Sequence, residues 1–214
     1  MLKTTLLAAA LSLSALGAKA QTFGEFLNKP ELLLTFMGVD FSATRYYGSP
    51  LTVDAGEMKG LFTRIDELLV KEASKYDLQK ALHRTGPVDY AINLAESVNT
   101  RIDTATIIVP AKTGLRPSFT PETVAELVKH YDYQAGRTGI GFVFVVETLD
   151  KRNESEVFWA TFVNLATKEM LFTQRISGDG AGVGFRNHWA HPLNSGITAI
   201  KQHYGDWKKK YAKG

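Results

Sequence analysis

Two stretches of the chain, residues 31–39 (ELLLTFMGV) and 140–146 (IGFVFVV), are apolar on both of the faces that a strand would present. A strand with one face in water alternates between apolar and polar residues, whereas a strand covered on both faces reads as a nearly continuous apolar run. We therefore expect both stretches to be strands near the middle of a sheet, with helices over both of its faces.

Helical spacing of apolar residues marks three other segments. Residues 54–76 predict one helix, with Asp54 and Glu57 in its first turn, where the helix dipole favours acids. Residues 121–133 predict a second, with Thr120 as its cap and Pro121 at its first position. The C-terminal stripe consists of Phe185, Trp189, Leu193, Ile197, Ile200, Tyr204, Trp207 and Tyr211.

Pro192 interrupts the C-terminal pattern. A proline inside a helix lacks the N–H that would bond the carbonyl four residues earlier, here that of His188, and its ring collides with that carbonyl. We expect this helix either to kink at Pro192 or to begin near His191.

The second half of the chain predicts a compact group of strands at residues 140–146, 156–165 and 169–176. The turns between them are too short for a parallel return, so they form an antiparallel meander. Residues 104–109 (TATIIV) predict a short strand that Pro110 ends. Residues 88–98 fit either an alternating strand or a short helix. The expected fold is a single α/β (α+β) domain: a mixed sheet of five or six strands with this C-terminal meander, covered by helices.

The first twenty residues have the composition of a secretory signal peptide. Lys3 precedes an apolar run, and Ala18 and Ala20 provide the small residues of a cleavage site before Gln21. The run is shorter than the roughly 20 apolar residues that span a bilayer; the alternative to a signal peptide is a buried N-terminal helix. We expect a signal peptide at 1–20 and one domain at 21–214, periplasmic or secreted, with no transmembrane segment in the mature chain.

Charge and cysteine content narrow the possible partners. Cleavage would remove Lys3 and Lys19 and no acid, which lowers the formal net charge from +3 to +1. A nearly neutral domain gives no electrostatic reason to expect nucleic acid as a partner. The chain has no cysteine, so its stability must come from a core and not from disulfides.

Residues 178–184 (GDGAGVG) form a glycine-rich loop between a predicted strand and a predicted helix. Such a loop either connects closely packed elements or presents backbone N–H groups to an anion. Its glycines do not have the spacing of the dinucleotide-binding fingerprint, and the Walker Lys-Ser/Thr pair is missing. No cofactor is expected.

The candidate ligand-binding residues follow this loop and are Asp179, Arg186, Asn187, His188 and His191. His188 and His191 could face one metal ion, but a zinc site needs three or four protein ligands, so no metal site is expected. Both histidines project away from the apolar stripe, which predicts that they face solvent. The sequence has no cysteine nucleophile and no G-x-S-x-G motif, and it identifies no catalytic residue.

Between Thr138 and Ile197 the chain resembles a group of exported proteins of Gram-negative bacteria that have no assigned activity. The segments that carry the likeness are 139–147 (GIGFVFVVE), 166–169 (ATKE) and 184–190 (GFRNHWA), with a weaker match at 39–42 (VDFS). The order of the last elements is also similar to small cell-envelope domains such as the TolB N-terminal domain. That second likeness concerns the fold alone and implies no site.

Two hypotheses about function follow. The first is a non-catalytic binding or assembly module of the cell envelope that uses residues 178–191 to hold an envelope protein or a small ligand. The alternative is a hydrolase in which Asp179, Arg186 and His188 act as acid, anion clamp and base. A pocket that gathers these three side chains would favour the hydrolase.

Overall fold

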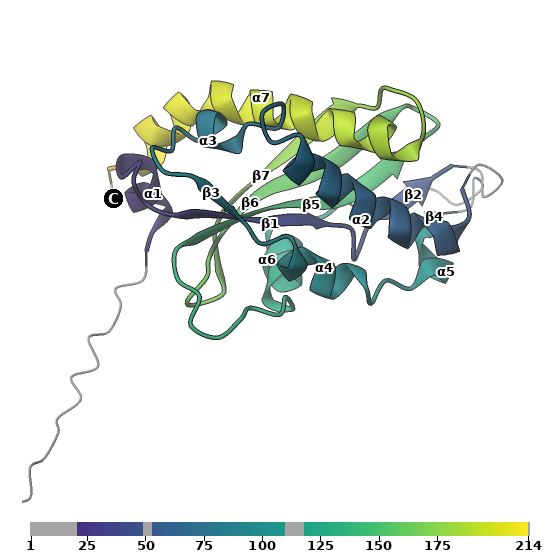
Figure 1. Ribbon diagram of the computed structural model, residues 1–214, viewed down its shortest axis with the longest axis horizontal. Helices are drawn as coiled ribbons and strands as arrows, with labels where there is room; N and C mark the ends of the chain where they lie inside the picture. The colour runs from purple at the N-terminus through teal and green to yellow at the C-terminus, as the bar shows by residue number, and fades with distance from the viewer. Residues whose placement is uncertain (1–20, 49–52, 110–117, 214) are drawn as a thin grey trace, which may run out of the picture.

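The computed structural model describes residues 21–48, 53–109 and 118–213; the expected signal peptide and Pro110 lie outside them. The chain forms a seven-stranded mixed sheet with helices on both faces (Figure 1), which confirms the single α/β domain. The expected number of five or six strands is wrong, because Arg45–Tyr47 adds a short strand that the sequence did not predict. The strands are β1 Leu34–Asp40, β2 Arg45–Tyr47, β3 Val88–Tyr90, β4 Ile108–Val109, β5 Ile140–Asp150, β6 Ser155–Asn164 and β7 Glu169–Asp179. The helices are α1 Phe23–Asn28, α2 Ala55–Lys71, α3 Leu78–Ala81, α4 Asn93–Asn99, α5 Thr104–Ile107, α6 Pro121–Lys129 and α7 Phe185–Tyr211.

Strand β5 is the centre of the sheet. On one side it pairs in parallel first with β1 and, further along, with β2. Strands β3 and β4 continue the sheet outward from β1 and β2, also in parallel. On the other side, β6 and then β7 follow in antiparallel order. The three-stranded meander is therefore confirmed.

The two apolar stretches form buried strands, but the first begins at Leu34 and not at Glu31. The chain turns before it, with the Leu32 N–H donating to the Lys29 carbonyl, and Glu31 and Leu33 are exposed. Every residue of β1 is buried, and in β5 all are buried except Thr148. Phe142 and Phe144 of β5 belong to the core under α1, α2 and α7, whereas Val143 and Val145 pack on the opposite face with α4 and α6. Figure 1 shows α7 and α2 on one side of the sheet and α4 and α6 on the other.

The predicted helices α2 and α6 end earlier than expected. The Asp54 side chain caps α2 by accepting the N–H of Gly56, and the helix stops at Lys71 instead of continuing to 76. Helix α6 stops at Lys129 instead of 133, where the His130 N–H donates to the Leu127 carbonyl and tightens the last turn. Beyond this end the Tyr131 hydroxyl donates to the buried Asp40 carboxyl at 2.8 Å.

Residues 88–109 combine the predicted alternatives. A three-residue strand, β3, is followed by helix α4, so both interpretations of 88–98 hold for part of the segment. The predicted strand at 104–109 is wrong for its first four residues, which form α5. The Asp103 carbonyl explains this, since it accepts bonds from the backbone N–H and the hydroxyl of Thr106 and so closes a turn.

Helix α7 is continuous from Phe185, so a start near His191 is wrong. The described part of the chain contains no helix that is both long enough and apolar enough to cross a membrane.

Candidate functional site

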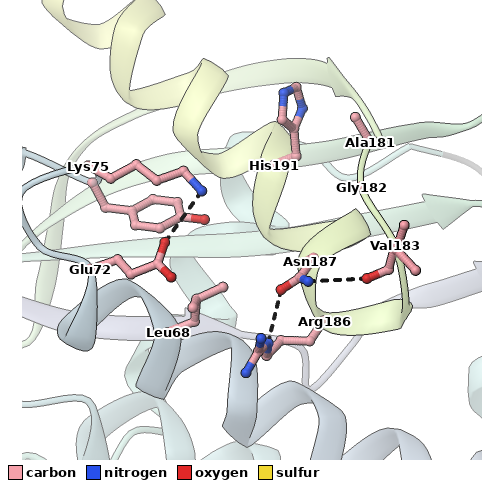
Figure 2. A pocket seen from close by; sticks show the side chains of 10 residues that line it. Leu68, Glu72, Lys75, Ala181, Gly182, Val183, Arg186, Asn187 and His191 are labelled. Atoms are coloured by element: carbon pink, nitrogen blue, oxygen red, sulfur yellow. Dashed lines mark hydrogen bonds and ion pairs between the residues drawn. The ribbon is translucent and has the colours of Figure 1, made fainter.

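A groove lies between the end of α2 and the start of α7, beside the glycine-rich loop (Figure 2). Its volume is about 360 Å³. One wall comes from α2 and the turn after it, and the other from the loop and the first two turns of α7. The residues that line it are Leu68, Glu72, Lys75, Tyr76, Ala181, Gly182, Val183, Arg186, Asn187 and His191. We call it the α2–α7 groove.

The loop wall is held by a short chain of hydrogen bonds. Asn187 Nδ2 donates to the Val183 carbonyl at 3.1 Å, and Arg186 Nε donates to Asn187 Oδ1 at 3.1 Å. Figure 2 shows both bonds along one side of the groove. Gly184, the N-cap of α7, has a φ of 79° and makes no side-chain capping bond. A side chain would be strained at this φ, which explains why glycine precedes the helix.

The α2 wall carries a lysine close to a buried tyrosine. Lys75 Nζ lies 3.4 Å from Glu72 Oε2 and 5.1 Å from the centre of the Tyr76 ring. Burial raises the pKa of Tyr76, and the positive charges of Lys75 and Arg186 oppose that rise. Both cations therefore act on the same hydroxyl.

A second hollow of about 260 Å³ adjoins the groove on the other side of Arg186. It is lined by Leu61, Arg64, Val183, Gly184, Phe185, Arg186 and Asn187. Neither Arg64 nor Arg186 has a carboxylate within ion-pair distance in the described ranges. Of the charged residues in the two hollows, only Glu72 is an acid, so positive charge is in excess.

His191 lines the groove and is exposed, as predicted. Its Nδ1 lies 3.1 Å from the Asp179 carbonyl oxygen. A carbonyl can only accept, so Nδ1 carries the proton. Nε2 is left to accept a bond when the ring is neutral and to donate one when it is charged.

His188 does not face solvent, so that prediction is wrong. It is 7% exposed, and its ring meets the Trp189 ring edge-on, with 4.5 Å between the ring centres. A side chain at Gly180 would overlap the His188 ring. His188 Nε2 lies 2.9 Å from Glu154 Oε2, but the approach does not have hydrogen-bond geometry, since Nε2 has no such partner among the described residues.

The three residues of the hydrolase hypothesis do not share the groove. Arg186 lines it, whereas His188 is packed against Gly180 and Asp179 is absent from the lining. Asp179 ends β7 with an exposed side chain and contributes its carbonyl to His191. In the described segments no three histidine or acidic residues are placed to hold a metal ion.

Sequence reasoning missed the α2 half of the groove. Leu68, Glu72 and Lys75 follow one another at helical spacing, which predicts that they share a face. That spacing does not say which other segment the face meets. The contact with the loop comes from tertiary packing, so only the loop half could be proposed from the sequence.

Comparison with protein-family models, with curated proteins and with solved structures found no match for this chain. The resemblance to exported Gram-negative proteins therefore stays an expectation.

Proposed function

We propose that the protein is an exported, non-catalytic binding module that holds a small anionic ligand in the α2–α7 groove. The observation that supports this most directly is the excess of positive charge: Arg186, which lines the groove and the adjoining hollow, and Arg64, which lines that hollow, lack a carboxylate partner among the described residues. Arginine binds carboxylates and phosphates through a planar fork of N–H donors, which suits a ligand that carries either group.

Backbone groups at the groove also favour an anionic ligand. Helix α7 begins at the groove wall, and its first turn carries N–H groups and the positive end of a 27-residue helix dipole. The hydrolase receives no comparable support, because Asp179 and His188 lie outside the groove lining. The acid and base of that hypothesis are therefore absent from the groove lining, whereas its cations and the start of α7 are the features that bind an anion.

Export is the second part of the proposal and depends on the pattern of residues 1–20. Helix α1 begins just after the expected cleavage site, and Thr22 and Glu25 cap its start reciprocally. Removal of residues 1–20 would leave that cap intact. Mass spectrometry of the protein made in a Gram-negative host should find Gln21 as the N-terminus in the periplasm or medium. An uncleaved chain in the cytoplasm would contradict export.

The ligand proposal is tested by titration followed by backbone NMR. Inorganic phosphate and succinate, used separately, should shift amides of residues 181–187 at concentrations up to about 10 mM, the range of a weak single-site anion. Tetramethylammonium chloride controls for ionic strength. The two anions distinguish a phosphate from a carboxylate ligand, and no shift with either would reject the proposal.

Arg186→Gln tests whether this arginine takes part in binding the anion. Loss of one charge-assisted contact should weaken binding by roughly tenfold. Lys201→Gln, an exposed residue of the same helix outside the groove, is the control and should bind as the parent does. Equal weakening in both variants would indicate a general charge effect and not a site.

A further inference from the structure

The glycine-rich loop carries an exposed apolar side chain just before α7. Val183 is 90% exposed, and among the described residues the other exposed large hydrophobic is Leu33, at 51%. Gly182 and Gly184 flank Val183 with φ angles of 103° and 79°, a conformation that other residues adopt only under strain. A single exposed apolar side chain is common on protein surfaces, so its meaning depends on what surrounds it.

A side-chain amide fixes Val183 beside a cation. Asn187 Nδ2 donates to the Val183 carbonyl, and Asn187 Oδ1 accepts from Arg186 Nε, both at 3.1 Å. Figure 2 shows the Asn187 amide between the two residues. Asn187 takes only the Nε donor of Arg186, whose two Nη groups donate to none of the described residues. The loop therefore presents an apolar side chain and a free pair of donors together.

Val183 also lies between two hollows that carry positive charge. It lines the α2–α7 groove together with Lys75, and the adjoining hollow together with Arg64, while Arg186 lines both. Lys75 is paired with Glu72 at 3.4 Å, whereas the two arginines have no carboxylate partner in the described ranges. Uncompensated positive charge thus surrounds the exposed valine.

This combination matches the surface of an anionic bilayer. The bilayer interface accepts apolar side chains, and its negative headgroups attract lysine and arginine. A free anion would use the arginines but leave Val183 in water, whereas a lipid in a bilayer uses both. A protein partner would need an interface with an apolar core, and Val183 is a single side chain. The charge and the exposed valine together favour a lipid surface.

We propose that the loop around Val183 docks on a bilayer that contains anionic phospholipids. Val183 enters the interface, and Arg64 and Arg186 bind lipid phosphates on either side of it. The inference rests on the proposed function, because the lipid headgroup takes the place of the small anionic ligand. Binding is peripheral and reversible, since one apolar side chain and two cations give only a weak anchor.

Sedimentation with vesicles tests the proposal. Protein with Gln21 as its N-terminus is used, because the apolar run of residues 1–20 would itself bind lipid; every described helix and strand follows Gln21. Vesicles of phosphatidylcholine with an equal part of phosphatidylglycerol should bind the protein at about 1 mM lipid. Vesicles of phosphatidylcholine alone should bind it at least about tenfold more weakly. Equal binding to both vesicles, or binding to neither, would overturn the proposal.

The free-anion titration distinguishes this failure from failure of the proposed function. If inorganic phosphate shifts the amides of residues 181–187 but anionic vesicles do not bind, the groove holds a soluble anion and the membrane inference is wrong. If neither phosphate nor vesicles bind, both proposals are wrong.

A fluorescent label shows whether the tip of the loop enters the lipid. The chain has no cysteine, so Val183→Cys can be labelled at one place with an environment-sensitive dye. Its emission should rise and move to shorter wavelength with phosphatidylglycerol vesicles, but not with inorganic phosphate. Leu33→Cys, labelled in the same way, is the control and should not respond. An equal response at the two positions would overturn the placement of Val183 in the interface.

Two pairs of variants separate the apolar and the charged contributions. Val183→Ser should weaken binding to the anionic vesicles by about tenfold, whereas Leu33→Ser should not weaken it. Arg64→Gln should weaken it by about fivefold, whereas Lys208→Gln, an exposed residue in the last turn of α7, should bind as the parent does. Equal weakening by Lys208→Gln would assign the attraction to the C-terminal lysines and overturn the proposal.

Discussion

The N–H of Ala181 donates to the carbonyl of His188 at 3.3 Å. In an uninterrupted helix that carbonyl would accept from residue 192, which is Pro192 and has no N–H. The glycine-rich loop thus supplies the bond that the proline removes. This explains how α7 can start at Phe185 and continue through Pro192.

The same contact joins the loop to the first turns of α7. His188 also packs its ring on Gly180, and His191 Nδ1 contacts the Asp179 carbonyl at 3.1 Å. These backbone bonds and histidine contacts therefore hold the loop wall of the α2–α7 groove against the start of α7.

Gly180→Ala should destabilise the protein, because the added methyl group would overlap the His188 ring. We expect a loss of about 1–3 kcal/mol in the free energy of unfolding, as for other overpacked sites. Gly205→Ala on α7 is the matched control, since nothing lies within 4 Å of its added methyl, and it should stabilise by about 0.5–1 kcal/mol. Urea denaturation measures both, and a neutral Gly180→Ala would show that the ring can move aside freely.

Two buried tyrosines allow a comparison of hydrogen-bond acceptors. The Tyr131 hydroxyl donates to the Asp40 carboxyl, and the Tyr133 hydroxyl donates to the Val128 carbonyl, both at 2.8 Å. Tyr131→Phe should cost about 2 kcal/mol and Tyr133→Phe about 1 kcal/mol at pH 7, because a bond to an ionised carboxylate is stronger than a bond to a backbone carbonyl. Denaturation of both variants tests the order; the reverse order would mean that Asp40 is neutral or finds another donor.

The main lines of the fold could be predicted from local sequence patterns. The continuous apolar runs identified β1 and β5 as central strands, and the short turns after Asp150 and Leu165 required antiparallel neighbours. These predictions depend on periodicity and chain length, which are properties of neighbouring residues.

Predictions that depended on distant contacts were less successful. The start of α7 depends on Ala181, and the burial of His188 depends on Gly180. Ala181 and Gly180 both belong to the glycine-rich loop. A helical projection of residues 185–211 gives no information about the path of that loop. The same reason applies to the α2 wall of the groove, where Lys75 and Tyr76 meet the loop only after folding.

His188 should titrate below its ordinary range. Burial lowers its pKa from 6.5 and the positive charge of Lys151 lowers it further, while Glu154 opposes them. A histidine with a lowered pKa in the folded state stabilises above pH 6.5, and this contribution is lost as the pH falls through the folded pKa. Lys151→Gln should raise the pKa of His188 and Glu154→Gln should lower it, both measured by NMR of the ring. Shifts in the opposite directions would contradict the placement of these charges.

Glu156 on β6 is an unpaired acid in the core. It is fully buried, and neither carboxyl oxygen has a hydrogen-bond partner among the described residues. Burial raises its pKa well above 4.5, so its contribution to stability is present below pH 4.5 and is lost as the pH rises through the folded pKa. Glu156→Met should therefore stabilise the protein at pH 7, by about 1–3 kcal/mol, and by less near pH 4.5. Denaturation at both pH values tests this, with the exposed Glu169→Met expected to stay within about 0.5 kcal/mol of the parent. A gain at Glu156 that is the same at both pH values would show that the carboxyl is not held protonated by burial.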